Sequence, residues 1–171
     1  MLSLYNILVE NRARIVSGVQ AKIPREVRAY SRVPRGELRE SIEHLYDAYL
    51  DLVASGKDEK LRHMFGYIAR VRVAQGFRLG SILRALLVFN AVVRPILQEI
   101  FRYSGAPDAE ARKAFNEAFA TIEVTTFDAI STFSEVFQDY VQSRVDEHNQ
   151  YLQQKNRQHG IDLSKFVLFR A

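Results

Sequence analysis

The chain has 171 residues, of which 47% are hydrophobic and 26% are charged, and its formal net charge is +4. This size and composition are typical of one globular domain and exclude a disordered or fibrous chain. The lack of cysteine excludes disulfides, thiolate metal sites and thiol catalysis. Because no basic segment precedes an apolar run near the N-terminus, we expect no secretory signal and a cytoplasmic protein.

Two helices are predicted before residue 57. Ser3 can cap the first helix, and Pro24 is expected to end it. Its apolar positions recur at helical spacing: Tyr5, Leu8, Ile15, Val16 and Val19. A basic connector, 25–35, leads to a second helix that begins near Pro34 and ends where Gly56 can supply a left-handed cap. The inner stripe of this second helix is Leu38, Ile42, Leu45, Tyr49, Leu52 and Val53.

The middle of the chain predicts two helices folded about Gly76. The third helix starts after Asp58, and its inner side carries Leu61, Met64, Phe65, Ile68, Val71 and Arg72. The fourth is lined by Leu79, Ile82, Leu83, Leu86, Leu87, Val93, Leu97, Ile100 and Phe101. Pro95 can kink this fourth helix because its ring frees the carbonyl of Ala91. The most apolar stretch, 82–93, is too short to span a bilayer, so we expect no membrane helix.

The last predicted helix is unusually long. From Asp108 its apolar positions keep steps of three and four residues, and no proline or glycine interrupts them before Gly160. If it is unbroken, the helix is about 75 Å long, which exceeds the core of a single domain of this size. We therefore expect its second half to leave the bundle or to meet another chain. A break in the β-branched cluster 121–126 is the alternative.

Charge is unevenly distributed along the chain. Residues 60–98 hold seven Lys or Arg and no acid, whereas residues 103–171 hold seven Lys or Arg against ten Asp or Glu. We interpret this as basic middle helices that pack beside an acidic last helix, with their rims paired. A nucleic-acid-binding surface is the alternative that such an excess leaves open.

Three polar residues at or beside apolar stripes form the one candidate ligand pocket. They are Arg72, Asn90 and Arg94, and the ligand that they imply is a small anion or carboxylate. The alternative is that Asn90 or Arg94 pairs with backbone freed by Pro95, or that Arg94 extends to the rim of the bundle.

Catalytic and metal templates find no match. The sequence has no glycine-rich phosphate loop, no His-Glu-x-x-His, no di-iron Glu-x-x-His pair and no serine nucleophile motif. The four histidines, His44, His63, His148 and His159, lie beside the inner stripes or far along the last helix. We therefore predict no enzyme, no metal and no haem or other cofactor.

A family resemblance adds to this interpretation. The run Arg70–Phe77 (RVRVAQGF) followed by Ile82–Leu86 (ILRAL) resembles the signature of the helical N-terminal domain of RsbT co-antagonist proteins, the RsbR-type sensor domain of stressosomes. The LYNILVENR start and the ELR start of the second helix fit as well, so the likeness covers roughly residues 2–150. The resemblance implies a globin-like fold without haem, a symmetric dimer, and a long final helix that leads into an output domain. Since 161–171 are too few for such a domain, we expect the output to come from a partner or from a longer chain.

These observations together predict an all-α, five- to six-helix globin-like bundle over residues 1–141, with a C-terminal helix extension and apolar tail over 142–171. The predicted function is a non-catalytic sensor or scaffold module of bacterial signal transduction that acts as a homodimer and through a downstream signalling partner. The predicted dimer or partner interface comprises Tyr140, Val141, Val145, His148, Tyr151, Leu152, Phe166 and Phe169. Two alternatives stay open: a haem or small-ligand-binding globin-type sensor, and a regulator that binds nucleic acid through a basic surface.

Overall fold

Helices account for every element in the part of the chain that the structure, a computed structural model, describes, residues 3–158. In chain order they are α1 (Leu4–Glu10), α2 (Arg12–Glu26), the short 3-10 helix η1 (Arg28–Arg32), α3 (Arg35–Ser55), α4 (Glu59–Ala74), α5 (Leu79–Arg102) and α6 (Asp108–Gln158). The predicted all-α class, with five to six helices and a long C-terminal helix, is therefore confirmed.

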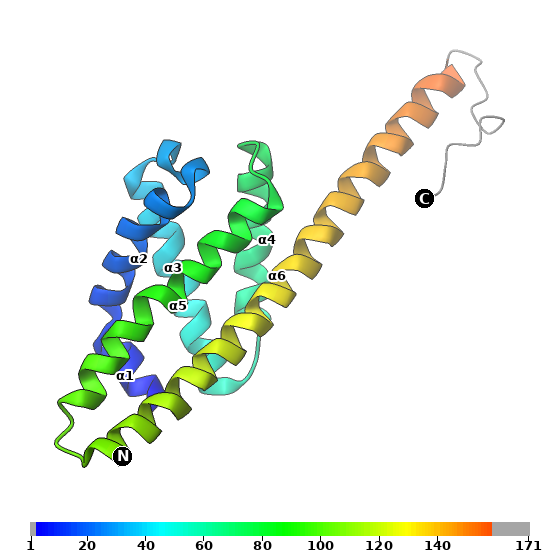
Figure 1. Ribbon diagram of the computed structural model, residues 1–171. Coiled ribbons are helices and arrows are strands. Elements are labelled where there is room, and N and C mark those ends of the chain that lie inside the picture. The colour runs from blue at the N-terminus through cyan, green and yellow to red at the C-terminus, as the bar shows by residue number, and fades with distance from the viewer. Residues whose placement is uncertain (1–2, 159–171) are drawn as a thin grey trace.

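The bundle is organised around α5 (Figure 1). This helix packs against α2 and α6, while α4 packs against α3 and α6. The core consists of apolar side chains from every α-helix, and the largest of those under 2% exposed are Phe65, Phe133, Ile7, Leu8, Ile15, Leu61, Ile82, Leu97, Ile122, Val88 and Val93. Burial of these side chains supplies the main driving force for folding.

The predicted first helix is two helices, and Pro24 does not end it. The side chain of Ser3 caps α1 by accepting a hydrogen bond from the Asn6 N–H at 3.2 Å, as predicted. The break lies at Asn11, whose side-chain amide donates to the Ile7 carbonyl at 2.9 Å. An asparagine that competes in this way for backbone groups interrupts a helix readily. Pro24 lies inside the last turn of α2, and the helix continues for two residues beyond it, to Glu26.

Two glycines end helices as the sequence predicts. Gly56 adopts φ 71° after α3, and Gly76 adopts φ 75° after α4. At the second site the Gly76 N–H donates to the Val73 carbonyl at 2.9 Å and the Phe77 N–H to the Arg72 carbonyl at 2.8 Å, which is the Schellman arrangement. This turn brings Phe77 back onto the end of α4.

One predicted core position of α5 is wrong. Leu87 is 51% exposed, because α2 and α6 cover other faces of this helix and leave Leu87 on the outward face with Arg84 and Ala91. By length and composition α5 is also the one described helix that could span a membrane. The buried core helix of a soluble protein has the same composition, and Val93 and Leu97 of α5 are fully buried in this bundle.

The last helix is unbroken over its 51 residues. The Thr121 hydroxyl donates to the Glu117 carbonyl at 3.0 Å and the Thr125 hydroxyl to the Thr121 carbonyl at 2.8 Å, so these threonines are accommodated without the break that was the alternative. Beyond Tyr140, every side chain described up to Lys155 is exposed. Figure 1 shows this half of α6 projecting away from the other helices, as its length predicts.

Candidate functional site

Arg72 is the only charged side chain that is buried in the described part of the chain, at 2% exposure. From the last turn of α4 its Nη1 donates to Glu37 Oε1 at 2.8 Å and to Gln75 Oε1 at 2.6 Å. The side-chain amide of Gln75 donates to the same Glu37 oxygen at 3.0 Å. The hydrogen bond from Gln75, followed by that from Arg72, lowers the pKa of Glu37 against the opposing effect of partial burial. This network joins the start of α3 to the end of α4.

Two aromatic rings cover the guanidinium of Arg72. Its central carbon lies 5.3 Å from the ring centre of Tyr30 in η1 and 5.5 Å from that of Phe77. The two rings meet edge to face at 4.8 Å. Cation–π contact stabilises the guanidinium where little water reaches it. Burial also raises the pKa of Tyr30, although the charge of Arg72 opposes that shift.

A cavity of about 100 Å³ lies inside the bundle between α2, α3, α4, α5 and α6. Most of its walls are apolar. The polar side chains among its lining residues are Tyr30, Ser41, Tyr46, Tyr49, Arg72 and Thr126. Such a space suits a small molecule that is largely apolar and has few polar atoms.

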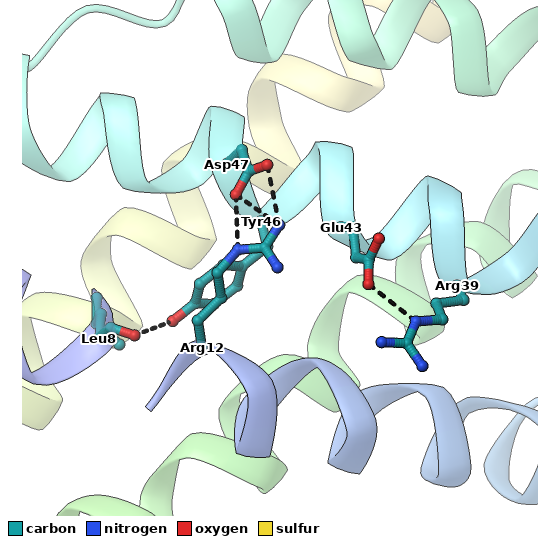
Figure 2. A network of polar contacts seen from close by, with 6 residues as sticks. All are labelled: Leu8, Arg12, Arg39, Glu43, Tyr46 and Asp47. Atoms are coloured by element: carbon teal, nitrogen blue, oxygen red, sulfur yellow. Dashed lines mark hydrogen bonds and ion pairs between the residues drawn. The ribbon is translucent and has the colours of Figure 1, made fainter. Parts of the chain in front are cut away.

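The hydroxyl of Tyr46 is fully engaged in the structure. It donates to the Leu8 carbonyl at 2.8 Å, and Figure 2 shows the hydroxyl directed at this oxygen. Beside it, Arg12 forms two hydrogen bonds of 3.0 Å to the carboxylate of Asp47. These contacts fasten α1 and α2 to α3.

The hydroxyl of Tyr49, by contrast, is buried without a hydrogen-bond partner among the described residues. Tyr49 lies one turn after Tyr46 on α3, and its ring packs against Phe89 with centres 4.8 Å apart. Burial raises the pKa of Tyr49 to about 12, while weak hydrogen-bonding interactions with Thr126 and Thr125 oppose that shift; neither threonine makes a hydrogen bond of normal geometry to the Tyr49 hydroxyl. The side chain is therefore a neutral hydrogen-bond donor at the wall of the cavity.

The structure gives the three predicted pocket residues different surroundings. Arg72 lines the cavity and pairs with Glu37. The side-chain oxygen of Asn90 accepts a hydrogen bond of 2.8 Å from the Thr126 hydroxyl, which links α5 to α6. Arg94 is exposed, with its guanidinium 5.2 Å from the ring centre of Phe119. Neither Asn90 nor Arg94 lines the cavity, and an anion pocket formed by the three stays a prediction.

The predicted interface residues of α6 form an exposed stripe. Tyr140 is half-buried where the helix leaves the bundle, and Val141, Val145, His148, Tyr151 and Leu152 follow it on the projecting half. A shallow groove beside Val73 of α4 is lined by Tyr140, Val141, Arg144, Val145 and His148. Phe166 and Phe169 lie outside the described residues.

The described histidines are on the surface. His44, His63 and His148 are exposed, and none of them lines the cavity; His159 lies outside the described residues. Within residues 3–158, no group of three or more His, Cys, Asp or Glu side chains comes together as a metal site would require.

The charge distribution has one predicted consequence. Arg62 of the basic segment on α4 pairs with Glu135 of the acidic helix α6 at 3.2 Å, across the seam between the helices. Arg62 also pairs with Asp58 at 2.7 Å. The excess of positive charge between residues 60 and 98 is therefore partly neutralised within the fold.

Sequence analysis missed the partners of Arg72. Glu37 and Arg72 are 35 positions apart, and no local pattern announces that they meet. Phe77 could have been found, because a glycine that ends a helix in the Schellman arrangement is commonly followed by a residue that packs back onto the last turn.

Comparison with known proteins assigns the chain to a family. No curated protein and no solved structure matches the chain. Over residues 10–148, the chain matches the model of the family described as the RsbT co-antagonist protein rsbRD N-terminal domain; this confirms the resemblance of the Arg70–Phe77 run, and the chain belongs to that family.

Proposed function

We propose that this protein is a non-catalytic sensor or scaffold module of bacterial signal transduction that works as a homodimer in the cytoplasm and through a downstream protein partner. Its family is one of stressosome-type signalling domains and is not a known class of enzyme. Signalling domains of this kind act through interaction surfaces. The question for this chain is therefore which surface is left for a partner.

The apolar stripe on the projecting half of α6 is the observation that carries the proposal. Val145, which lines the groove beside Val73 of α4, is 47% exposed, and Tyr151, farther along the projecting half, is 57% exposed. Val141, Val145, His148 and Leu152 follow one another at steps of four, three and four residues. This is the alternation of core positions in a two-stranded coiled coil.

Pairing with the same segment of a second copy would cover this stripe. An exposed apolar seam of this length on a monomer favours association, and a symmetric pair buries it on both chains at once. We further propose that residues 142–171 act as an extension of the bundle whose role is this pairing and the contact with the output partner. Residues 1–141 then form the sensing bundle.

Sedimentation of the intact protein tests the dimer. We expect a dimer at concentrations on the order of tens of micromolar, and a shift to monomer for Val145→Glu, which places a charge in the seam. Gln150→Glu is the matched control, because it adds the same charge on the opposite face of the same helix. It should leave the dimer intact.

Two results would count against this arrangement. A monomeric full-length protein under these conditions would refute dimerisation. If Val145→Glu remained as dimeric as the parent, or if a chain ending at Tyr140 dimerised equally well, the interface would lie within the bundle and not along the projecting helix.

A further inference from the structure

The hydroxyl of Tyr49 is an unusual feature of this core. Buried polar groups in proteins nearly always find a hydrogen-bond partner, because leaving one unpaired costs about 1–3 kcal/mol. Tyr49 is 6% exposed and lines the cavity, yet its hydroxyl makes no hydrogen bond of normal geometry to any described residue, Thr126 and Thr125 included. Tyr46 lines the same cavity, but its hydroxyl is paired with the Leu8 carbonyl, so the missing hydrogen bond is what distinguishes Tyr49.

The size of the cavity limits what could pair with this hydroxyl. At about 100 Å³ it is smaller than the roughly 150 Å³ apolar cavity that accepts benzene in an engineered protein core. Most of the wall is aliphatic or aromatic, including Ile15, Ile42, Ile82 and Phe65. A molecule that fits must therefore be small and mostly apolar, with one polar atom for the Tyr49 hydroxyl.

The charge balance of the cavity favours an uncharged molecule. Arg72 is its one charged lining residue, and Glu37 already neutralises the guanidinium at 2.8 Å. Glu37 and Tyr49 are separated on α3 by twelve positions, about 18 Å along the helix axis at 1.5 Å per residue. A carboxylate beside Tyr49 would thus be buried far from an available positive charge, which is strongly unfavourable.

We propose that the cavity binds a small, uncharged and mostly apolar molecule whose carbonyl or hydroxyl oxygen accepts a hydrogen bond from Tyr49. A tyrosine is protonated at physiological pH even at its ordinary pKa of 10, and burial raises the pKa of Tyr49 further, so its hydroxyl is available as a donor. The idea that such binding is a signal rests on the proposed sensor function. Binding itself is measured separately from dimerisation, so either can fail while the other stands.

Acetone, isobutane and acetate are suitable probes, because they are smaller than benzene, have similar size and differ in the polar group. Titrations are followed through the methyl resonances of the isoleucines that line the cavity. We expect acetate to bind least. In Tyr49→Phe the dissociation constant of acetone should rise about tenfold, while that of isobutane should not rise.

Infrared spectroscopy supplies a second readout that does not depend on affinity. The carbonyl stretch of the bound ketone should shift to lower frequency in the parent protein and lose that shift in Tyr49→Phe. Tyr67→Phe, which removes a hydroxyl from a residue that is 45% exposed on α4, is the matched control and should behave as the parent does. The proposal is overturned if no cavity methyl responds to acetone, if Tyr49→Phe binds acetone as the parent does, or if acetate binds more tightly than acetone.

Discussion

The hydroxyl of Tyr46 on α3 donates a hydrogen bond of 2.8 Å to the carbonyl oxygen of Leu8 near the end of α1. The helix break at Asn11 explains why this carbonyl needs a side-chain donor. The Asn11 N–H bonds to Ile7 and the Ile15 N–H to Asn11, but the described backbone offers no N–H to the Leu8 oxygen. Tyr46 therefore completes a hydrogen bond that an unbroken helix would have made, and it fastens α1 to the bundle.

We predict that Tyr46→Phe lowers the free energy of unfolding by about 1–3 kcal/mol, because the buried Leu8 carbonyl loses its partner. Tyr49→Phe is the matched control on the same helix. It removes a hydroxyl that has no described partner and should leave stability unchanged or slightly higher. Urea unfolding of both variants measures the difference, and an equal loss in the two would contradict this account of Tyr46.

The two members of the buried ion pair should respond differently to removal. The Arg72 side chain is 3% exposed and the Glu37 side chain is 33% exposed. Glu37→Gln leaves a buried cation without its counterion, which we expect to cost about 3 kcal/mol. Arg72→Met leaves a carboxylate that water can reach and should cost less, about 1–2 kcal/mol, in the same unfolding measurement. A larger loss for Arg72→Met would show that the packing of its stem against Tyr30 and Phe77 dominates.

The same pair predicts a pH dependence. Hydrogen bonds from Gln75 and Arg72 lower the pKa of Glu37 in the folded protein, so its ionised form is stabilised by folding. This contribution is fully present above the ordinary carboxyl pKa of 4.5 and is lost as the pH falls through the lower, folded value. The stability difference between the parent and Glu37→Gln should therefore be constant near neutral pH and shrink in acid. If the stability difference stayed the same at pH values below the folded pKa of Glu37, the ionisation of Glu37 would not be its cause.

Local features of the fold could be predicted from the sequence, whereas most contacts between distant segments could not. Gly56 and Gly76 marked the ends of α3 and α4 because a left-handed residue there has few alternatives to glycine. The length of α6 could be predicted because its apolar residues keep helical spacing with no proline or glycine between them. Its projection from the bundle could be predicted because a helix of that length exceeds the core of a domain of this size. Pro24 misled because α2 continues two residues beyond it, and Leu87 misled because helical spacing does not say which faces the neighbouring helices cover.

The candidate site shows the same limit. The sequence singled out Arg72 and Asn90 as polar residues on apolar stripes that required partners. It could not show that those partners are Glu37 and Thr126, each more than thirty positions away, because both pairs form only when the helices pack. The cavity likewise exists only in the packed bundle, so no local pattern revealed the role of Tyr49 at its wall.

Asn90 and Thr126 should behave as a coupled pair. Asn90→Leu leaves the Thr126 hydroxyl, on a residue that is 4% exposed, without its acceptor, and we expect a loss of about 1–2 kcal/mol. In a Thr126→Val background the same substitution should cost much less, because both polar groups are then gone. Unfolding free energies of the two single variants and the double variant test this. Strict additivity would mean that the bond contributes little to stability.

The last prediction concerns the crossing of α2 and α5. A β-carbon added at Gly18 would lie 2.8 Å from Cγ1 of Val92, closer than non-bonded atoms normally approach. Val92 has one favoured rotamer in a helix and cannot easily move aside, so overpacking of about 1–3 kcal/mol should outweigh the gain in helix propensity of about 1 kcal/mol from Gly18→Ala.

Gly66 on α4 provides the matched control, because a β-carbon there meets nothing within 4 Å. Gly66→Ala should therefore stabilise the protein by about 0.5–1 kcal/mol. In a Val92→Ala background the clash disappears, so Gly18→Ala should become stabilising. Thermal unfolding of Gly18→Ala, Gly66→Ala, Val92→Ala and the Gly18→Ala/Val92→Ala double variant measures these differences. If Gly18→Ala raised the stability of the parent protein as much as Gly66→Ala does, α2 and α5 would not cross as closely as this packing requires.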